Sequence, residues 1–327
     1  MKKLLGLILV IAMVLSMGLS ATAEEGLKVA VVLSGATGDR SFYDSANEGL
    51  QALVASDLGI QGTLIECKND ASMFTTNLIA AAEDNDIVIA VGWEFWDALT
   101  EYAPQLPDTK FIFIDNGLDG VGDNLMSITY AQNEGSFLVG YIAGTMSKTG
   151  KIGVVGGEDS DTINDFIVGY EAGAQYAKAD TVVERKYTDD YEDPAKGKEA
   201  ALALYDMGCD IVFAVAGKTG EGVFEAAAET GNYAIGVDSD QKYINPDLIL
   251  CSMVKRVNKS IYDVVSDMDG KFQPNQIWSA DMATGYIDVA YGTEDMPQQV
   301  SDELKAEVEE LKAKIISGEI VVPSTLN

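Results

Sequence analysis

The chain contains no histidine and only three cysteines, and both shortages restrict the chemistry that it can perform. Without histidine, neither a Ser-His-Asp triad nor a Cys-His pair can form, and the most common zinc ligand is missing. Cys67, Cys209 and Cys251 each lie in or beside an apolar segment, and no Cys-x-x-Cys motif is present. This pattern indicates buried free thiols rather than a disulfide framework or a redox centre. We expect no metal site and no cofactor.

Basic residues are also scarce, because 22 lysines and arginines stand against 52 aspartates and glutamates in a chain of 327 residues. The resulting net charge of −30 gives a surface that repels nucleic acid and anionic membranes, and no basic stripe offsets it. The composition therefore argues against a nucleic-acid partner. We expect the protein to be a monomer.

Residues 1–23 have the layout of a secretory signal peptide. A short basic head precedes an apolar run from Leu4 to Leu19, and Ala21-Thr22-Ala23 offers the small residues of a cleavage site. The run is short for a membrane span, although an uncleaved anchor is the alternative interpretation, and no cysteine follows it to carry a lipid. We predict cleavage after Ala23 and a soluble extracytoplasmic protein, either periplasmic or at the cell surface. Loss of Lys2 and Lys3 from the 22 basic residues leaves 20 against 52 acidic ones, a net charge of −32.

From residue 27 onward, short apolar segments rich in β-branched residues alternate with segments of helical periodicity. The predicted strands are Lys28–Leu33, Gly62–Cys67, Asp86–Val91, Lys110–Asp115, Met126–Tyr130, Lys151–Val155, Val182–Tyr187, Asp210–Ala216, Tyr233–Val237 and Leu248–Met253. Strands that are apolar throughout are buried on both faces, which is typical of parallel strands covered by helices. We therefore predict an α/β fold with two doubly wound parallel sheets, since a chain of this length is near the size at which one core divides into two.

The predicted strands fall into two lobes, because a fresh series of βα units starts at Lys151. No linker rich in proline or serine separates the two series, so the lobes are expected to be joined by strands that cross directly. We assign residues 24–130 and 256–290 to the amino-terminal lobe, and residues 131–255 and 291–327 to the carboxyl-terminal lobe. The segment from Gly318 to Pro323 is interpreted as a closing strand or a docked end.

Polar and aromatic residues follow the strands of both lobes, at the edge where ligands bind in open α/β sheets. These residues are Ser34, Trp93 and Asp115 in the first lobe, and Tyr191, Gly217 and Asp238 in the second. A cleft lined by aromatic faces and a few carboxylates suits a polyhydroxylated or heterocyclic small molecule. Trp93 directly follows a strand and is expected in the cleft, with a place in the lobe core as the alternative.

The aspartates near the strand ends have other interpretations. Asp161 and Asp189 fit helix caps as well as ligand contacts. Asp189, Asp190 and Asp193 would be the candidate paired carboxylates of an exported hydrolase. Acidic runs are usually solvated, however, and the sequence shows no set of base and nucleophile, so we favour a protein that binds without catalysis.

Several motifs are distinctive when taken together. They are Glu134-Gly-Ser-Phe-Leu-Val-Gly140, Gly153-x-Val-Gly-Gly157, Phe166-x-x-Gly-x-x-Ala-Gly173, Asp193-Pro-Ala-Lys196, Gly236-Val-Asp-Ser-Asp-Gln241 and Ser252-Met-x-Lys255. In these motifs the chain resembles the basic membrane protein family of bacterial substrate-binding proteins over nearly all of its mature length. The resemblance implies a two-lobed type I periplasmic-binding-protein fold with three crossovers, serving an ABC importer. The best-understood branch of the family binds purine nucleosides.

The resemblance also implies which residues contact the ligand. Phe42, which follows an Asp-x-Ser motif, would stack on a base, while Asp238 and Lys255 would reach the ribose side. Matching pocket positions are occupied by Asp115, Gly217 and Tyr191. Relatives usually carry Thr-Asp and a Gly-Gly-Ile stretch after the first strand, whereas this chain has Leu33 to Gly38 there, and many carry a lipid-attachment cysteine that this chain lacks.

Together, these observations predict an extracytoplasmic solute-binding protein of an ABC importer, with no enzymatic activity. It would hold a purine-nucleoside-like ligand between its lobes and deliver it to a membrane permease. The alternatives are a binding protein that feeds a membrane receptor, and a protein that binds a different solute such as a sugar.

Overall fold

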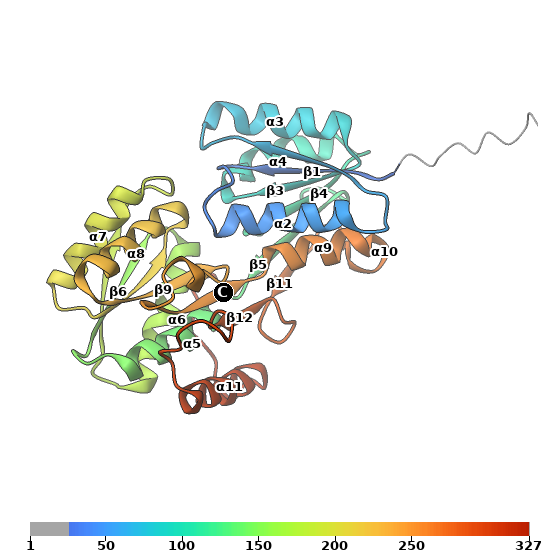
Figure 1. Ribbon diagram of the computed structural model, residues 1–327. Helices are drawn as coiled ribbons and strands as arrows, with labels where there is room; N and C mark the ends of the chain where they lie inside the picture. The colour runs from blue at the N-terminus through green and yellow to red at the C-terminus, as the bar shows by residue number, and fades with distance from the viewer. Residues whose placement is uncertain (1–25, 327) are drawn as a thin grey trace, which may run out of the picture.

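The computed structural model describes residues 26–326, so the predicted signal peptide and its cleavage site lie outside the described residues. Figure 1 shows two lobes side by side, each a sheet covered by helices. The strands are β1 Lys28–Leu33, β2 Gln61–Glu66, β3 Ile87–Val91, β4 Lys110–Ile114, β5 Leu125–Tyr130, β6 Lys151–Gly156, β7 Val182–Tyr187, β8 Ile211–Val215, β9 Tyr233–Asp238, β10 Ile249–Lys255, β11 Ile277–Ala280 and β12 Ile287–Ala290. Each strand expected from the apolar segments is present.

The helices fall between the strands, as the alternating pattern predicts. They are α2 Phe42–Ala55, α3 Ala71–Asp84, α4 Trp96–Tyr102, α5 Gln132–Met146, α6 Asp161–Ala177, α7 Pro194–Asp206, α8 Glu221–Thr230, α9 Val257–Ser266, α10 Met268–Lys271 and α11 Asp302–Ile316. Capping residues explain where two of the helices begin. The Ser160 hydroxyl accepts the Ile163 N–H at the start of α6, and Asp193 caps α7 just before Pro194. No helix between residues 26 and 326 is long and apolar enough to cross a membrane.

The two sheets share one architecture. The first runs in the order β11-β5-β4-β3-β1-β2 and the second in the order β12-β10-β9-β8-β6-β7, so β4 and β9 hold equivalent places, as do β5 and β10. All neighbouring strands are parallel except β10 and β12. Central strands such as β1 are buried from Val29 to Leu33, because helices cover both faces. The predicted doubly wound α/β fold is confirmed.

The chain crosses between the lobes three times: from β5 into α5, from β10 into α9, and between β11 and β12. The first two crossings fall at the predicted boundaries. The third corrects the prediction, which assigned residues 256–290 to the first lobe, because β12 pairs with β10 of the second sheet, with Val289 opposite Met253. A turn with Gly285 at φ 79° separates β11 from β12 and passes the chain to the other sheet.

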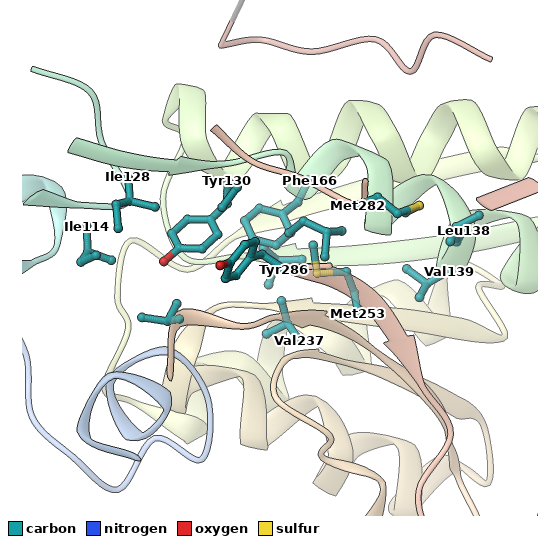
Figure 2. Close-up of a cluster of buried hydrophobic side chains, with 14 of the residues drawn as sticks. Ile114, Ile128, Tyr130, Leu138, Val139, Phe166, Val237, Met253, Met282 and Tyr286 are labelled. Atoms are coloured by element: carbon teal, nitrogen blue, oxygen red, sulfur yellow. The ribbon is translucent and has the colours of Figure 1, made fainter. Parts of the chain in front are cut away.

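A continuous apolar cluster extends through the crossings. Figure 2 shows Ile114 and Ile128 of the first sheet together with Val237 and Met253 of the second, and Tyr130 lying between them. All these side chains are buried. Strands of both sheets therefore pack in one apolar cluster, which continues from one lobe into the other.

Helices α5 and α6 approach so closely that their backbones are in contact. A Cβ atom added at Gly140 would lie 2.1 Å from the carbonyl oxygen of Tyr170, and one at Gly173 would lie 1.9 Å from that of Phe137. Only glycine permits this distance. The glycines of the two sequence motifs thus set the position of α6, whose amino-terminal end faces the cleft.

The carboxyl-terminal segment is a docked end and not a strand, which resolves the two interpretations of the tail. The side chain of Asn133 donates to the carbonyl oxygens of Val322 and Pro323, at 3.3 and 3.1 Å. The buried Asp165 accepts the hydroxyl of Ser324 at 2.6 Å. These bonds hold the tail on the first turns of α5 and α6.

The three cysteines are buried and free, as predicted. Burial raises the pKa of the Cys209 thiol to about 11 and that of Cys251 to about 12. Thiols with such pKa values are protonated at neutral pH and therefore unreactive.

Candidate functional site

A pocket lies between the lobes, where the carboxyl ends of the strands of both sheets meet. Of the eight residues predicted from the sequence, seven line it: Phe42, Trp93, Asp115, Tyr191, Gly217, Asp238 and Lys255. The remaining lining residues are Asp39, Tyr43, Gly92, Glu94, Ser160, Thr162, Ile163, Phe166, Val215, Ala216 and Val237. The rule that ligands bind beyond the carboxyl ends of parallel strands therefore locates the pocket in this protein.

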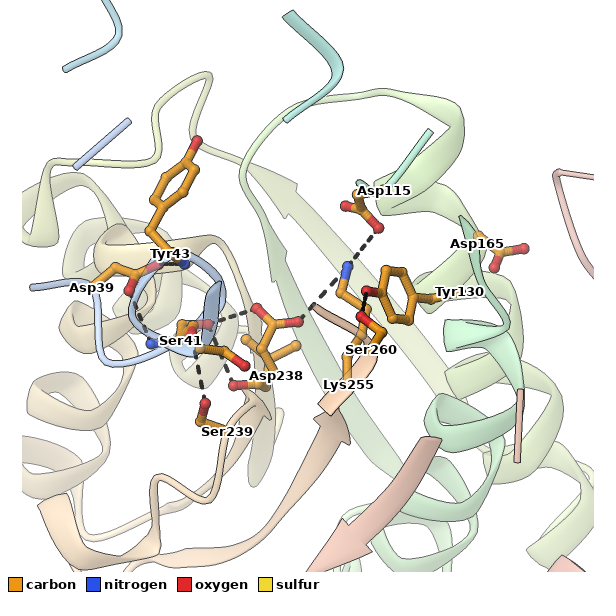
Figure 3. Close-up of polar contacts among 12 residues, drawn as sticks. Asp39, Ser41, Tyr43, Asp115, Tyr130, Asp165, Asp238, Ser239, Lys255 and Ser260 are labelled. Atoms are coloured by element: carbon orange, nitrogen blue, oxygen red, sulfur yellow. Dashed lines mark hydrogen bonds and ion pairs between the residues drawn. The ribbon is translucent and has the colours of Figure 1, made fainter. Parts of the chain in front are cut away.

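Lys255, the last residue of β10, is the buried cation of the pocket. Its Nζ donates to Asp115 Oδ1 at 2.8 Å and lies 3.9 Å from Asp238 Oδ1, as Figure 3 shows. The rings of Phe42 and Phe166 lie beside the ammonium group, with centroids 4.8 and 5.1 Å away. Two carboxylates and two aromatic faces thus compensate for the loss of water around one charge.

Asp115 and Asp238 both follow the same pattern, since each comes at the end of an equivalent strand with a positive φ, 73° and 62° respectively. Such a conformation is unfavourable for a residue other than glycine, and aspartate is among those that tolerate it. It turns both carboxylates toward Lys255. Backbone strain of this kind often occurs at functional sites.

Asp238 has one satisfied and one unsatisfied oxygen. Its Oδ2 accepts the hydroxyl of Ser41, across the cleft, at 2.6 Å. Its Oδ1 is buried and has no hydrogen-bond partner among residues 26–326. Burial raises the pKa of the Asp238 carboxyl, while the charge of Lys255 and the bond from Ser41 oppose this rise. The side chain therefore has an acceptor available inside the pocket.

Asp39, which the sequence analysis missed, shapes the entry to α2. Its carboxylate accepts the backbone N–H groups of Ser41, Tyr43 and Asp44 at 3.1, 2.9 and 3.0 Å. Burial raises the pKa of Asp39 to about 7, although these hydrogen bonds lower it. The acid of the Asp-x-Ser-Phe motif thus fixes the helix start that presents Phe42 to the pocket.

The aromatic part of the pocket comes from both lobes. Phe42 and Tyr43 on α2 have ring centroids 5.3 Å apart, and Trp93, which follows β3, is half exposed at the rim. From the other lobe, Tyr191 is held against Gly157, where an added Cβ would lie 2.0 Å from the tyrosine ring. Trp93 therefore lies in the pocket wall and not in the core of the lobe.

Ser34 is the one predicted residue that does not line the pocket. It is fully buried, and its hydroxyl lies 2.9 Å from the hydroxyl of Tyr43. The side chain therefore supports Tyr43 from behind. The end of β1 brings Ser34 to the correct edge of the sheet, but its hydroxyl lies against Tyr43, which lines the pocket in its place.

The acidic run after β7 lies outside the pocket. Asp190 pairs with Lys196 at 2.8 Å, and Asp193 accepts the N–H of Ala195 as the cap of α7. At α6 the capping side chain is Ser160 and not Asp161. None of these aspartates lines the pocket, so the hydrolase interpretation has no support from the geometry.

Two further lining residues were missed for different reasons. Phe166 stands in one of the sequence motifs but falls inside α6, away from any strand end. Glu94 was missed because, in the run from Gly92 to Trp96, only the aromatic residues were considered as candidates for the cleft.

No group of three or more Cys, Asp or Glu side chains between residues 26 and 326 is placed to hold a metal ion.

Comparison with known proteins gives consistent results. The family model described as ABC transporter substrate-binding protein, PnrA-like, matches residues 27–325. Basic membrane protein A of Borreliella burgdorferi is 33% identical over 332 residues, with 99% of this chain and 96% of that protein covered. The ABC transporter nucleoside-binding protein BmpA of Lactococcus lactis is 33% identical over 329 residues, with 94% and 92% covered.

Solved structures agree with the fold. An ABC transporter solute-binding protein from Aeropyrum pernix K1 aligns with a TM-score of 0.81 at 27% identity, and the alignment covers 91% of this chain and 94% of that one. A transcriptional activator of the comK gene from Bacillus halodurans aligns with a TM-score of 0.75 at 22% identity, covering 90% and 99%. The second likeness concerns the fold alone.

Proposed function

The chain belongs to the PnrA-like family of ABC transporter substrate-binding proteins, and on this basis we propose that its solute is a purine nucleoside or a close analogue. As a member of this family it is an extracytoplasmic binding protein that works with a membrane permease, and not an enzyme. The proposal concerns the identity of the solute, its delivery to an importer, and the residues that hold it.

The observation that carries the proposal is the free oxygen of Asp238. This Oδ1 is buried beside Lys255 in a pocket whose lining includes the aromatic residues Phe42, Tyr43, Trp93, Phe166 and Tyr191. A buried acceptor without a donor is costly, so a ligand hydroxyl that donates to it is strongly favoured. A nucleoside combines such hydroxyl groups with a flat ring that suits the aromatic wall.

The remaining predicted residues have compatible roles. Phe42 and Tyr191, from opposite lobes, would contact the two faces of the ring. Lys255 would donate to a ligand oxygen while it keeps its bond to Asp115, and Gly217 would allow close approach of the backbone. Affinity in the micromolar range or tighter, about −8 kcal/mol or better, would suit capture followed by release to a permease.

Thermal unfolding tests the identity of the solute. A ligand present at a hundred times its Kd stabilises the folded state by about 2.7 kcal/mol. We expect inosine, guanosine or adenosine to raise the melting temperature more than ribose or galactose does. If the sugars raise it and the nucleosides do not, the nucleoside proposal is wrong, while the transport role is unaffected. Native mass spectrometry of the protein purified without heating would identify a retained solute directly.

Export as a processed monomer is the second part of the proposal. The Ala21-Thr22-Ala23 sequence and the absence of a lipid-attachment cysteine after the apolar run support cleavage after Ala23. Intact-mass measurement of the secreted protein checks this cleavage. A mass that retains residues 1–23, or one that includes a lipid, would contradict it. Light scattering on the same sample tests the monomeric state.

A further inference from the structure

A second unsatisfied carboxylate oxygen lies in the pocket wall. Glu94 follows β3 in the short helical turn Trp93–Phe95, and its Oε2 is buried without a hydrogen-bond partner among the described residues 26–326. Among the pocket-lining residues that the structure describes, only Glu94 and Asp238 have a buried side-chain atom without a hydrogen-bond partner. The hydroxyl of Ser34, which pairs with Tyr43, and the N–H of Glu94 itself also act on this carboxylate, because hydrogen bonding from both lowers its pKa. Oε2 can still accept a further donor, since a carboxylate offers about four lone-pair sites.

The order of the strands separates the two carboxylates. Asp115, Asp238 and Lys255 end β4, β9 and β10, which lie at or next to the strands where the chain crosses between lobes. Glu94 follows β3, which lies one strand further from that crossing. We call the side of the pocket near the crossings between the lobes its hinge side, and the opposite side its outer side. Asp115, Asp238 and Lys255 lie on the hinge side, and Glu94 lies on the outer side, next to Trp93.

We propose that Glu94 recognises the N–H edge of the ligand's ring, and that the preferred solutes are 6-oxopurine nucleosides, with guanosine bound most tightly. This inference rests on the proposed function, since it assigns the ring of a nucleoside to the outer side of the pocket. The hydroxyl groups of the sugar then reach Asp238 and Lys255 on the hinge side.

The chemistry of the ring edges supports this assignment. An ionised carboxylate only accepts hydrogen bonds, and it has two oxygens side by side. Guanine presents two adjacent donors on its Watson–Crick edge, the ring N–H and the amino group, and hypoxanthine presents the ring N–H. Adenine presents one amino donor beside a ring nitrogen that is itself an acceptor, so one carboxylate oxygen would meet a second acceptor.

The surroundings of Glu94 make a donor pair more valuable. Burial raises the pKa of its carboxyl, hydrogen bonding from its own N–H and from Ser34 lowers it, and the charges of Glu158 and Asp115 raise it further. Two N–H donors would stabilise the ionised form in this environment, since hydrogen bonds to a charged group are the stronger ones. A site that hydrogen-bonds a polar edge also rejects analogues that lack the matching group.

Calorimetry with guanosine, inosine and adenosine on the wild-type protein and on Glu94→Gln tests the proposal. Glutamine keeps the shape of the side chain but offers one acceptor and one donor, which matches adenine better than guanine. We expect the wild-type protein to bind guanosine at least tenfold more tightly than adenosine. Glu94→Gln should weaken guanosine binding tenfold or more, and should leave adenosine binding unchanged or tighter.

Glu158→Gln is the matched control, because it removes a nearby negative charge from a residue that does not line the pocket. It should keep the wild-type order of affinities. A wild-type protein that binds adenosine as tightly as guanosine overturns the assignment, and so does a Glu94→Gln variant that weakens all three ligands by one factor. If none of the nucleosides binds the wild-type protein, the proposed function itself fails.

Discussion

Asp115 and Asp238 hold the same place in the two sheets, yet they have different partners. Each stands at the end of an equivalent strand with a positive φ, and each bonds to a residue of the opposite lobe. Asp115 of the first lobe accepts the ammonium of Lys255, whereas Asp238 of the second accepts the hydroxyl of Ser41. Of these two aspartates, only Asp238 has a buried oxygen without a hydrogen-bond partner among residues 26–326.

The two aspartates therefore have different roles, although they occupy equivalent positions in the two sheets. The Asp115–Lys255 pair joins the lobes by a charged contact that is complete within the protein. The Ser41–Asp238 contact also joins the lobes, but it leaves Oδ1 of Asp238 without a hydrogen-bond partner among the described residues. Under the proposed function, a solute that bonds to this oxygen would contact the same side chain that links the two lobes.

The largest effect is expected from removing the charge that both aspartates share. Lys255→Met leaves two carboxylates near each other in a buried site without a cation, which should lower the free energy of unfolding by about 3–5 kcal/mol and abolish ligand binding. Chemical denaturation followed by circular dichroism measures the first effect, and calorimetry the second. Lys196→Met, which removes a partly exposed pair with Asp190, is the control and should cost less than about 1 kcal/mol. Equal losses in the two variants would contradict the central role of Lys255.

Asp238→Ala tests whether Asp238, unlike the equivalent Asp115, supplies the acceptor for the ligand. A charged acceptor bonded to a ligand hydroxyl contributes about 1.5–3 kcal/mol, so the affinity should fall tenfold or more. The apo protein should stay folded, because the variant also removes the cost of burying this carboxylate, whose pKa is raised by burial. Calorimetry and thermal unfolding of the same sample decide the outcome. Unchanged affinity with a lower melting temperature would mean that Asp238 serves the fold alone.

Phe42→Ala tests the aromatic wall that faces this polar pair. Stacking of a base on an aromatic side chain contributes about 1–3 kcal/mol by alanine substitution, so binding should again weaken about tenfold or more. Phe74→Ala is the control, since Phe74 packs edge-on against Phe95 in a core of the same lobe, away from the pocket. That variant should lower the melting temperature with little change in affinity. A reversal of the two results would place the ligand elsewhere.

Much of this arrangement is predictable from the sequence, because central strands that are apolar throughout specify a parallel sheet and hence an edge where ligands bind. The pattern could not separate β11 from β12, since both are four-residue strands whose partners, β5 and β10, are distant in the chain. Pairing between such short segments depends on tertiary contacts and not on local periodicity.

The site was predictable by position but not by side-chain direction. Ser34 and Glu94 both follow strands of the first sheet, yet Ser34 points behind Tyr43 while Glu94 lines the pocket. The positive φ of Asp115 and Asp238, which aims both carboxylates at Lys255, leaves no mark in the sequence because aspartate is common at any strand end. The structure was needed to distinguish residues that line the cleft from residues that support them.

Asp39 provides a pH-dependent test of the helix start that presents Phe42. Its pKa is raised from the ordinary value of 3.8 to about 7, so the folded state binds a proton that the unfolded state has released. The stabilisation is complete below about pH 4 and is lost as the pH rises to about 7, by up to about 1.4 kcal/mol for each pH unit. The unfolding free energy of wild type, relative to that of Asp39→Asn, should therefore fall over this range and then level off. A difference that stays constant from pH 4 to 8 would contradict the raised pKa.

The smallest effect is expected at the exposed rim of the same cleft, where Arg40 of the first lobe lies 3.6 Å from Glu221 of the second. This pair also joins the lobes, but both side chains are partly exposed, so the surrounding water weakens their attraction. A double-mutant cycle with Arg40→Gln and Glu221→Gln should give a coupling of about 0.2–1 kcal/mol in ligand affinity, and salt at about 0.5 M should remove it. A coupling as large as the effect of Asp238→Ala, or one that persists in salt, would mean that the rim and the buried Ser41–Asp238 contact hold the lobes together equally.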